Sequence, residues 1–186
     1  MITILLGKSA SGKDTMLSHM EKEGAKRIVT CTTRPRRKGE KEGVEYNFIS
    51  PELFKFWEKC KLFVETRSYN TLVEGKPDTW LYGSPELMNE EERDYATILD
   101  VSGTLSYIKH YGPEKIRVKY LVVPDVTRKE RAKKRGSFDV TEWNRRARDD
   151  AEKFSDKNIA KIKALLGNHF ETIDNSLGGV YGSELV

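Results

Sequence analysis

A glycine-rich segment near the start of the chain has the residue types of a phosphate-binding loop. Gly7, Gly12 and Lys13 match the pattern G-x-x-x-x-G-K, directly after the apolar run at residues 2–6. Glycines let consecutive backbone N–H groups turn toward one anion, and the N-terminus of a following helix adds its positive dipole end. The lysine supplies a point charge for the β and γ phosphates. The pattern predicts ATP binding by the residues of this loop, which are Gly7, Lys8, Ser9, Ala10, Ser11, Gly12, Lys13, Asp14 and Thr15.

The residue after Lys13 departs from this pattern. The position usually holds Ser or Thr, whose hydroxyl binds Mg²⁺, but here it is Asp14, with Thr15 one place later. A carboxylate is a hard oxygen ligand that suits Mg²⁺, and an anion is favourable in the first turn of a helix. We therefore expect Asp14 or Thr15 to serve a Mg²⁺ ion that accompanies ATP.

A second charged segment follows the loop. Four cations stand at residues 34–38 around a proline, and Tyr46 comes shortly after them. A charge run of this kind is commonly a solvated loop. Planar guanidinium groups beside hydroxyls and a tyrosine also suit the multipoint recognition of a second phosphate. Taken alone, these residues leave both interpretations open.

The two segments together resemble guanylate kinase, the nucleoside-monophosphate kinase that phosphorylates GMP. The loop is followed by T-T-R-x-x-R-x-G-E-x-x-G-x-x-Y-x-F at residues 32–48, and the resemblance extends from Gly7 to about Asn175. It implies transfer of the γ-phosphoryl group of ATP to GMP, giving ADP and GDP, with Mg²⁺ as the cofactor.

The resemblance also assigns an acceptor site. It places the GMP phosphate on Arg34, Arg37 and Tyr46. Glu65 matches the glutamate that reads the guanine edge, where a carboxylate accepts from the N1–H and amino groups. The other positions implied for GMP are Thr30, Tyr82, Ser84, Asp100 and Ser102, the last of which replaces a second acid of the family.

A strongly basic helical segment at about 125–149 is similar to the lid of guanylate kinases, in which arginines close over the triphosphate. The match assigns Arg131, Arg135 and Arg146 to this role, and Asn175 to the adenine side of ATP. Since the acceptor phosphate is already anionic near neutral pH, catalysis would rest on positioning and on charge neutralisation. The residues expected to carry it are Lys13, Arg37, Arg135 and Arg146, with Arg145 and Arg148 left open as alternatives to the last.

The elements that must position these residues alternate along the chain. Apolar runs predict strands at 2–6, 27–29, 46–49, 62–66, 95–101, 116–123 and 170–173. Apolar spacing and start signals predict helices at 14–23, from 51, around 105–108, and from 125 to about 166 with a break near Gly136. Ser84-Pro85 repeats the helix-start signal of Ser50-Pro51.

The alternation of predicted strands and helices, together with the resemblance, predicts an α/β fold. We expect a P-loop NTPase-type parallel sheet flanked by helices, with a small mixed α/β monophosphate-binding insertion and a basic helical lid. The whole of residues 1–186 would be a single domain. Its core would lie at 1–29, 95–124 and 150–186, its monophosphate-binding region at 30–94 and its lid at about 125–149.

The composition narrows the class of protein further. The chain has 186 residues, a net charge of +4 and 10% aromatic residues, which suits one packed domain. It has no apolar run of the ~20 residues that a membrane span needs, and no basic leader before an apolar stretch. Two cysteines exclude a disulfide framework. These features predict a cytoplasmic enzyme that binds ATP and GMP as small molecules, without nucleic acid or membrane partners.

Two alternatives remain open at the level of sequence. The first is a kinase of the same architecture for dGMP or another nucleoside or deoxynucleoside monophosphate, because Ser102 and the long stretch at 71–79 depart from the pattern. The second is a guanylate-kinase-like module that binds proteins and has lost catalysis. Gly12, Lys13 and the basic lid argue against the second.

Overall fold

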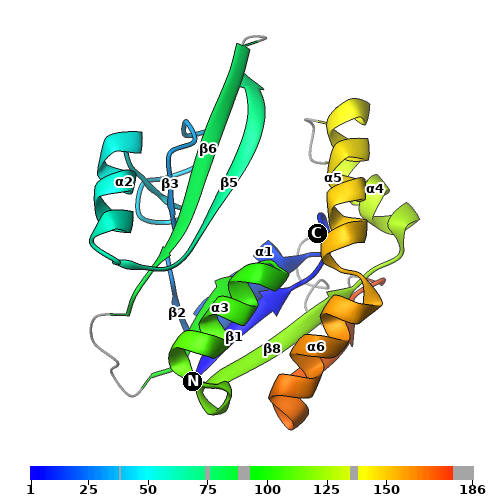
Figure 1. Cartoon of the computed structure of the whole chain (residues 1–186). Helices are drawn as coiled ribbons and strands as arrows, with labels where there is room; N and C mark the ends of the chain where they lie inside the picture. The colour runs from blue at the N-terminus through cyan, green and yellow to red at the C-terminus, as the bar shows by residue number, and fades with distance from the viewer. Residues whose placement is uncertain (38, 74–75, 88–92, 135–137, 178–186) are drawn as a thin grey trace. The chain divides into compact units, whose positions relative to one another are not determined.

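The computed structural model describes residues 1–37, 39–73, 76–87, 93–134 and 138–177 (Figure 1). The chain divides into two compact units. The first comprises Met1–Arg27 and Arg93–Val186, and the second comprises Ile28–Glu92.

A five-stranded sheet forms the centre of the first unit. Its strand order is β2-β7-β1-β8-β9, and every neighbouring pair is parallel. All five residues of β1 are buried, because parallel strands joined by crossover helices are covered on both faces. The strands are β1 (Ile2–Leu6), β2 (Lys26–Arg27), β7 (Tyr95–Ile98), β8 (Ile116–Val122) and β9 (Phe170–Asp174).

Helices alternate with these strands along the first unit. α1 packs through Met16 and Leu17 against Leu5, Ala96 and Leu121 of the sheet, and these residues form one apolar cluster. Two short 3₁₀ turns, Pro113–Lys115 and Gly167–His169, lead into β8 and β9. The helices are α1 (Lys13–Lys22), α3 (Val101–Tyr111), α4 (Asp125–Lys134), α5 (Val140–Lys153) and α6 (Asp156–Leu166).

In the described residues of the second unit, a four-stranded mixed sheet is accompanied by one helix. Its strand order is β4-β3-β6-β5, from β3 (Cys31–Thr32), β4 (Asn47–Phe48), β5 (Phe63–Val73) and β6 (Lys76–Pro85). Helix α2 (Pro51–Lys59) begins as predicted, because Ser50 Oγ accepts from the backbone N–H of Leu53 at 3.2 Å. Phe54 is buried and stacks on Phe63 with 4.7 Å between ring centroids.

The fold class predicted from the sequence is confirmed, but one start signal was wrong. Ser84-Pro85 lies at the end of β6 and does not begin a helix. Ser84 Oγ donates to Glu65 across the sheet at 2.6 Å, and Pro85 stands at a strand end, where its missing N–H does little harm. The strand expected at 62–66 is longer than predicted, because β5 continues to Val73 and pairs antiparallel with β6 as far as Val73 and Lys76.

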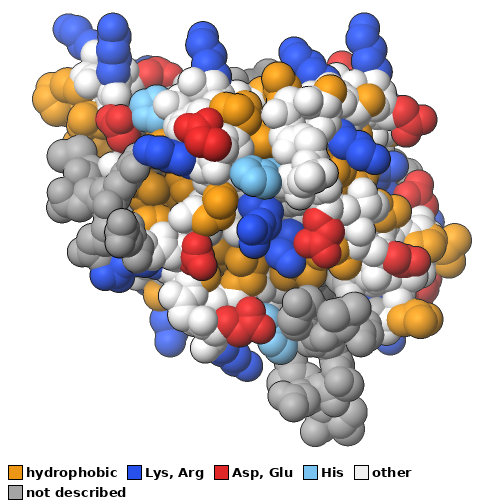
Figure 2. All heavy atoms as spheres, turned by 90° about the horizontal axis from the view of Figure 1, so that it is seen from below, with side chains coloured by type: hydrophobic (Ala, Val, Ile, Leu, Met, Phe, Trp, Pro, Cys, Tyr) orange, Lys and Arg blue, Asp and Glu red, His pale blue; other side chains and the backbone are white. Residues whose placement is uncertain are grey.

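The surface of the molecule carries charges of both signs. On the face seen in Figure 2, Lys and Arg side chains are interspersed with Asp and Glu. Among the helices that the structure describes, none has the length and apolar character required to cross a membrane.

Candidate functional site

The loop between β1 and α1 has a backbone that only glycine accommodates at two positions. Gly7 and Gly12 have φ values of 154° and 93°. A Cβ on Gly7 would stand 2.7 Å from the carbonyl oxygen of Leu121, and one on Gly12 would stand 2.5 Å from Nδ2 of Asn175. Backbone conformation therefore favours glycine at both positions, and at Gly7 the nearby backbone oxygen of Leu121 also leaves no space for a Cβ.

Lys13 lies over this loop. Its Nζ donates to the carbonyl oxygens of Gly7 at 2.7 Å and Lys8 at 2.8 Å. Gly12 is the N-cap of α1, and no described side chain caps the helix there. The N-terminal N–H groups of α1 and the Lys13 ammonium therefore lie together, which is the arrangement that binds an anion.

Asp14 and Thr15 occupy the first turn of α1, and both are exposed. Within the described residues, no three His, Cys, Asp or Glu side chains cluster as a metal site would need. Mg²⁺ commonly takes one or two protein oxygens and obtains its other ligands from phosphates and water. A single carboxylate or hydroxyl at the loop fits that demand.

Two residues that were not predicted from the sequence bind the backbone N–H and carbonyl groups of Ser9. Arg128 on α4 donates through Nη1 to the Ser9 carbonyl oxygen at 2.8 Å, and Asp150 on α5 accepts from the Ser9 N–H at 2.8 Å. The two side chains also pair with each other at 3.2 Å. Arg128 and Asp150 stand in separate helices, so no spacing in the sequence signals this ion pair.

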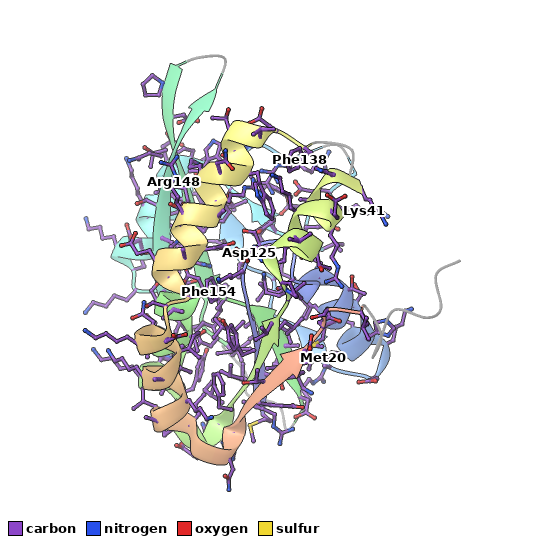
Figure 3. All side chains as sticks on the ribbon, turned by 90° about the vertical axis from the view of Figure 1, so that its right-hand side faces the viewer. Met20, Lys41, Asp125, Phe138, Arg148 and Phe154 are labelled. Carbon is purple, nitrogen blue, oxygen red and sulfur yellow. The ribbon has the colours of Figure 1, made fainter. Side chains whose placement is uncertain are left out.

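The Arg128 side chain is buried and has further partners that fix its position. Arg128 is only 1% exposed, and its guanidinium lies 5.5 Å from the ring centroid of Trp143. Its Nη2 donates to Asp125 at 2.8 Å, and this bond holds the pKa of the Asp125 carboxyl below its usual range. Figure 3 looks onto α4 and α5, with Asp125 at the start of α4 and Phe154 at the end of α5.

Arg131 and Asn175, which the resemblance assigns to ATP, both lie at the loop. Asn175 Nδ2 donates to the carbonyl oxygen of Ser11 at 2.9 Å. Arg131 Nη2 donates to the carbonyl oxygens of Asn175 at 2.7 Å and Ser176 at 3.3 Å. The segment after β9 is thereby tied to both the loop and α4.

The other arginines predicted for the lid have different surroundings. Arg135 lies outside the described residues. On α5, Glu142 accepts from Arg145 Nε and from Arg146 Nε, each at 2.7 Å. The hydrogen bond from Arg145 is the main cause that lowers the pKa of the Glu142 carboxyl to about 2, and the bond from Arg146 acts in the same direction. Arg148 Nε is 3.4 Å from the carbonyl oxygen of Asn144.

Asp100 and Ser102 stand at the start of α3 in the first unit. Asp100 is the N-cap residue and accepts from the Gly103 N–H at 3.0 Å. Ser102 Oγ donates to the same carboxylate oxygen at 2.9 Å, and Lys153 Nζ lies 3.5 Å from the other. Asp100 thus has a structural role in addition to any role toward a ligand.

In the second unit, Arg34 is held by its own loop. Its guanidinium forms a bidentate pair with Glu40 at 2.7 and 2.9 Å and lies 5.3 and 5.6 Å from the ring centroids of Tyr46 and Phe48. Arg34 is 3% exposed, whereas Arg37 is exposed and bonds Glu40 through its backbone N–H at 2.7 Å. Of the two arginines assigned to a phosphate, Arg37 is therefore the one open to solvent.

The Arg34–Glu40 pair predicts a dependence of stability on pH. The hydrogen bond from Arg34 holds the pKa of Glu40 below its ordinary value of 4.5. A lowered folded-state pKa stabilises the protein above pH 4.5, and this stabilisation is lost as the pH falls through the folded-state pKa. We expect Glu40→Gln to be less stable than wild type at pH 7, with a difference that narrows on acidification. Urea unfolding at several pH values measures it, and a difference that stays constant down to pH ~3 would contradict the assignment.

Aromatic rings surround this part of the second unit. Tyr46 and Tyr82 pack edge to face with centroids 5.9 Å apart, and Tyr69 meets Tyr82 in the same manner at 5.3 Å. The carbonyl oxygen of Thr30 accepts from the N–H of Asn47 at 2.9 Å. The structure thus brings together the two tyrosines that the resemblance assigns to GMP.

Glu65 and Ser84, which the resemblance assigns to GMP, are neighbours in the second unit. Glu65 is 7% exposed, and its Oε1 accepts from Ser84 Oγ at 2.6 Å. Arg67, which the sequence analysis missed, donates through Nη2 to the same oxygen at 3.2 Å, and its Nε lies 2.9 Å from Oε2. A signal was present, because residues two apart on a strand share a face.

The parallel sheet, with a glycine loop and a lysine between its central strand and the next helix, defines a P-loop nucleotide-binding protein. The family model described as guanylate kinase matches residues 1–176. The chain belongs to the guanylate kinase family, and the resemblance is confirmed.

Individual proteins that are similar to this chain support its membership of the guanylate kinase family. Guanylate kinase of Porphyromonas gingivalis is 28% identical over 156 residues, 82% of this chain and 80% of that protein. Guanylate kinase of Symbiobacterium thermophilum is 46% identical over 57 residues, which span 30% of this chain and only 27% of that protein. The crystal structure of guanylate kinase from Anaplasma phagocytophilum matches with a TM-score of 0.58 at 21% identity, covering 94% of this chain and 76% of that one, which supports the fold.

Proposed function

We propose that this chain transfers the γ-phosphoryl group of ATP to the phosphate of GMP, giving ADP and GDP. The observation that carries the proposal is the formed phosphate loop, in which Lys13 lies over the N-terminus of α1, within a chain matched by the guanylate kinase family over residues 1–176. The relatives named above are guanylate kinases.

On the donor side, the loop N–H groups and Lys13 bind the β and γ phosphates of ATP. Arg131 and Asn175, which are already tied to the loop, line the same side. Arg135 and Arg146 neutralise charge on the transferring group in this proposal. Positioning and charge neutralisation, rather than a general base, lower the barrier.

On the acceptor side, Arg37, Arg34 and Tyr46 bind the GMP phosphate, and an anionic oxygen of that phosphate attacks. The Arg34–Glu40 pair keeps the arginine in one orientation. Glu65 reads the guanine edge by accepting from its N1–H and amino groups. The remaining proposed contacts are those of Thr30, Tyr82, Ser84, Asp100 and Ser102.

Mg²⁺ would be held at Asp14 or Thr15 together with the phosphates of ATP, and it would offset the negative charge of the triphosphate. Titrating Mg²⁺ with Asp14→Ala and Thr15→Ala tests this assignment. An unchanged Mg²⁺ requirement in both variants would contradict it.

A coupled assay of ADP formation across GMP, dGMP, AMP, CMP, UMP and TMP tests the proposed function. Phosphorylation of GMP well above AMP and CMP is the expected result. A higher rate with another monophosphate would favour the related-kinase alternative. No turnover with any of them, in a folded protein that holds Mg²⁺ and ATP, would favour a non-catalytic module.

Arg37→Ala is expected to lower kcat with GMP by about 10²-fold, because an exposed guanidinium that neutralises the acceptor phosphate is removed. The dissociation constant for ATP should stay within about twofold, since the loop is untouched. Steady-state kinetics and calorimetry measure the two quantities. Arg36→Ala, an exposed neighbour outside the motif, is the matched control. Near-normal turnover of Arg37→Ala would refute the assignment.

The proposed partners are ATP and GMP only. Cys31 and Cys60 are both free thiols. This agrees with the proposal of a cytoplasmic location, where thiols stay reduced.

A further inference from the structure

One residue of the phosphate loop has a backbone conformation that residues with a Cβ rarely adopt. Ala10 has a φ of 60°, which lies in the left-handed region. This conformation costs free energy in every residue except glycine, and it persists only where the surrounding structure holds it. A left-handed residue within a turn directs successive backbone N–H groups toward one anion, so the strained conformation of Ala10 suits phosphate binding.

The two peptide groups before the left-handed residue are held by side chains from three helices. The carbonyl oxygen of Lys8 accepts from Lys13 Nζ on α1 at 2.8 Å. The N–H of Ser9, in the same peptide group, donates to Asp150 on α5 at 2.8 Å. The carbonyl oxygen of Ser9, in the next peptide group, accepts from Arg128 on α4 at 2.8 Å. The backbone that leads into the left-handed residue therefore has little freedom to relax.

Arg128 and Asp150, which we call the Ser9 clamp, are suited to this role by burial and charge. Their side chains are 2% and 10% exposed, and their nearest polar atoms lie 3.2 Å apart. A lone carboxylate beside the loop would repel the phosphates of ATP, but the guanidinium offsets its charge. Arg128 is fixed in turn by its bond to Asp125. The clamp thus presents one fixed acceptor and one fixed donor to the loop.

We propose that Asp150 and Arg128 are positioning residues for ATP, because the Ser9 clamp holds Ala10 in the left-handed conformation that the phosphate loop needs. The clamp is required because residue 10 is an alanine. A glycine at this position would adopt the same conformation without support. The inference rests on the proposed binding of ATP at this loop and adds two residues that act through the loop backbone.

The test measures the dissociation constant for ATP with Mg²⁺ by calorimetry, below the thermal transition of every variant. Asp150→Ala should raise it by about tenfold, because Ala10 is released to relax from its left-handed conformation. Asp150→Asn should stay within about threefold of wild type, since the amide oxygen can still accept from the Ser9 N–H. The control Asp149→Ala removes an exposed carboxylate from the same helix and should change the constant by less than about twofold.

The decisive comparison repeats Asp150→Ala in an Ala10→Gly background. Glycine needs no support at a φ of 60°, so the substitution should then change the dissociation constant for ATP by less than about threefold. A contribution of Asp150 to overall stability alone would not depend on residue 10. The KM for GMP should stay within about twofold in all of these variants, because the clamp acts on the donor loop.

Two results would overturn the inference: an ATP affinity of Asp150→Ala within about twofold of wild type, or an equal loss in both backgrounds. If Asp150→Ala does not fold, its combination with Arg128→Met removes both buried charges together and supplies the same comparison. Wild type that binds ATP but phosphorylates no monophosphate would contradict the proposed function, and the dissociation constants would still decide the inference. Wild type that binds no ATP would overturn both.

Discussion

Lys13→Ala should lower kcat/KM for ATP by about 10³-fold. The Lys13 ammonium lies over the phosphate loop, within 2.7–2.8 Å of two loop carbonyl oxygens. A preorganised charged donor aimed at transferring phosphate is worth about this much in transition-state stabilisation. Initial rates at varied ATP, with GMP saturating, measure the change.

Lys22→Ala is the matched control for Lys13→Ala, because it removes a charge from the last turn of the same helix. It should leave kcat/KM within about twofold. Lys13→Arg keeps the charge but spreads it over a wider group, so a partial recovery is expected. A Lys13→Ala enzyme within about tenfold of wild type would exclude Lys13 from the catalytic role.

Arg128→Ala should have the largest effect on stability. It leaves the buried carboxylate of Asp150 without its cation and the Ser9 carbonyl oxygen without that donor. Breaking a buried ion pair by removing one partner costs about 3–5 kcal/mol, which corresponds to a Tm lowered by about 10 °C in a chain of this size. Urea unfolding and thermal melts measure the free energy and the Tm. The KM for ATP should rise as well, because the loop loses one of its two supports at Ser9.

Arg145→Ala provides the comparison. Arg145 also forms two ion pairs, with Glu142 and Asp149, but its side chain is 44% exposed. Solvent-exposed pairs contribute about 0–1 kcal/mol, so this variant should melt close to wild type. Equal destabilisation by Arg128→Ala and Arg145→Ala would show that burial does not decide the strength of these pairs.

The phosphate loop could be predicted because its pattern is contiguous. Gly7, Gly12 and Lys13 lie within seven positions, and each residue type follows from a local requirement of backbone conformation or charge. The parallel sheet was predictable for a similar reason, since its buried strands are apolar runs such as β1 and β8. In the second unit, Glu65 and Ser84 were found only through the resemblance, because nothing in their spacing shows that they are paired across a sheet.

Ser50-Pro51 and Ser84-Pro85 show where local patterns fail. The two pairs carry the same start signal, but Ser50 Oγ accepts from the helix backbone whereas Ser84 Oγ donates to Glu65. The choice depends on a partner 19 positions away. The part of β5 beyond residue 66 and the whole of β6 were not predicted as strands, because their length rests on backbone pairing with each other rather than on a regular apolar alternation.

The bonds around Ser9 also have a consequence for the order of events during synthesis. Ser9 emerges from the ribosome early, but its two partners are 119 and 141 positions further along the chain. The central strand β1 also depends on segments that are synthesised much later, because its neighbours β7 and β8 begin only at Tyr95 and Ile116. Contacts of such long range form late and slow folding. A nascent chain that has not yet exposed Asp150 therefore lacks a finished phosphate loop, and nucleotide binding marks the completion of the fold rather than an early step in it.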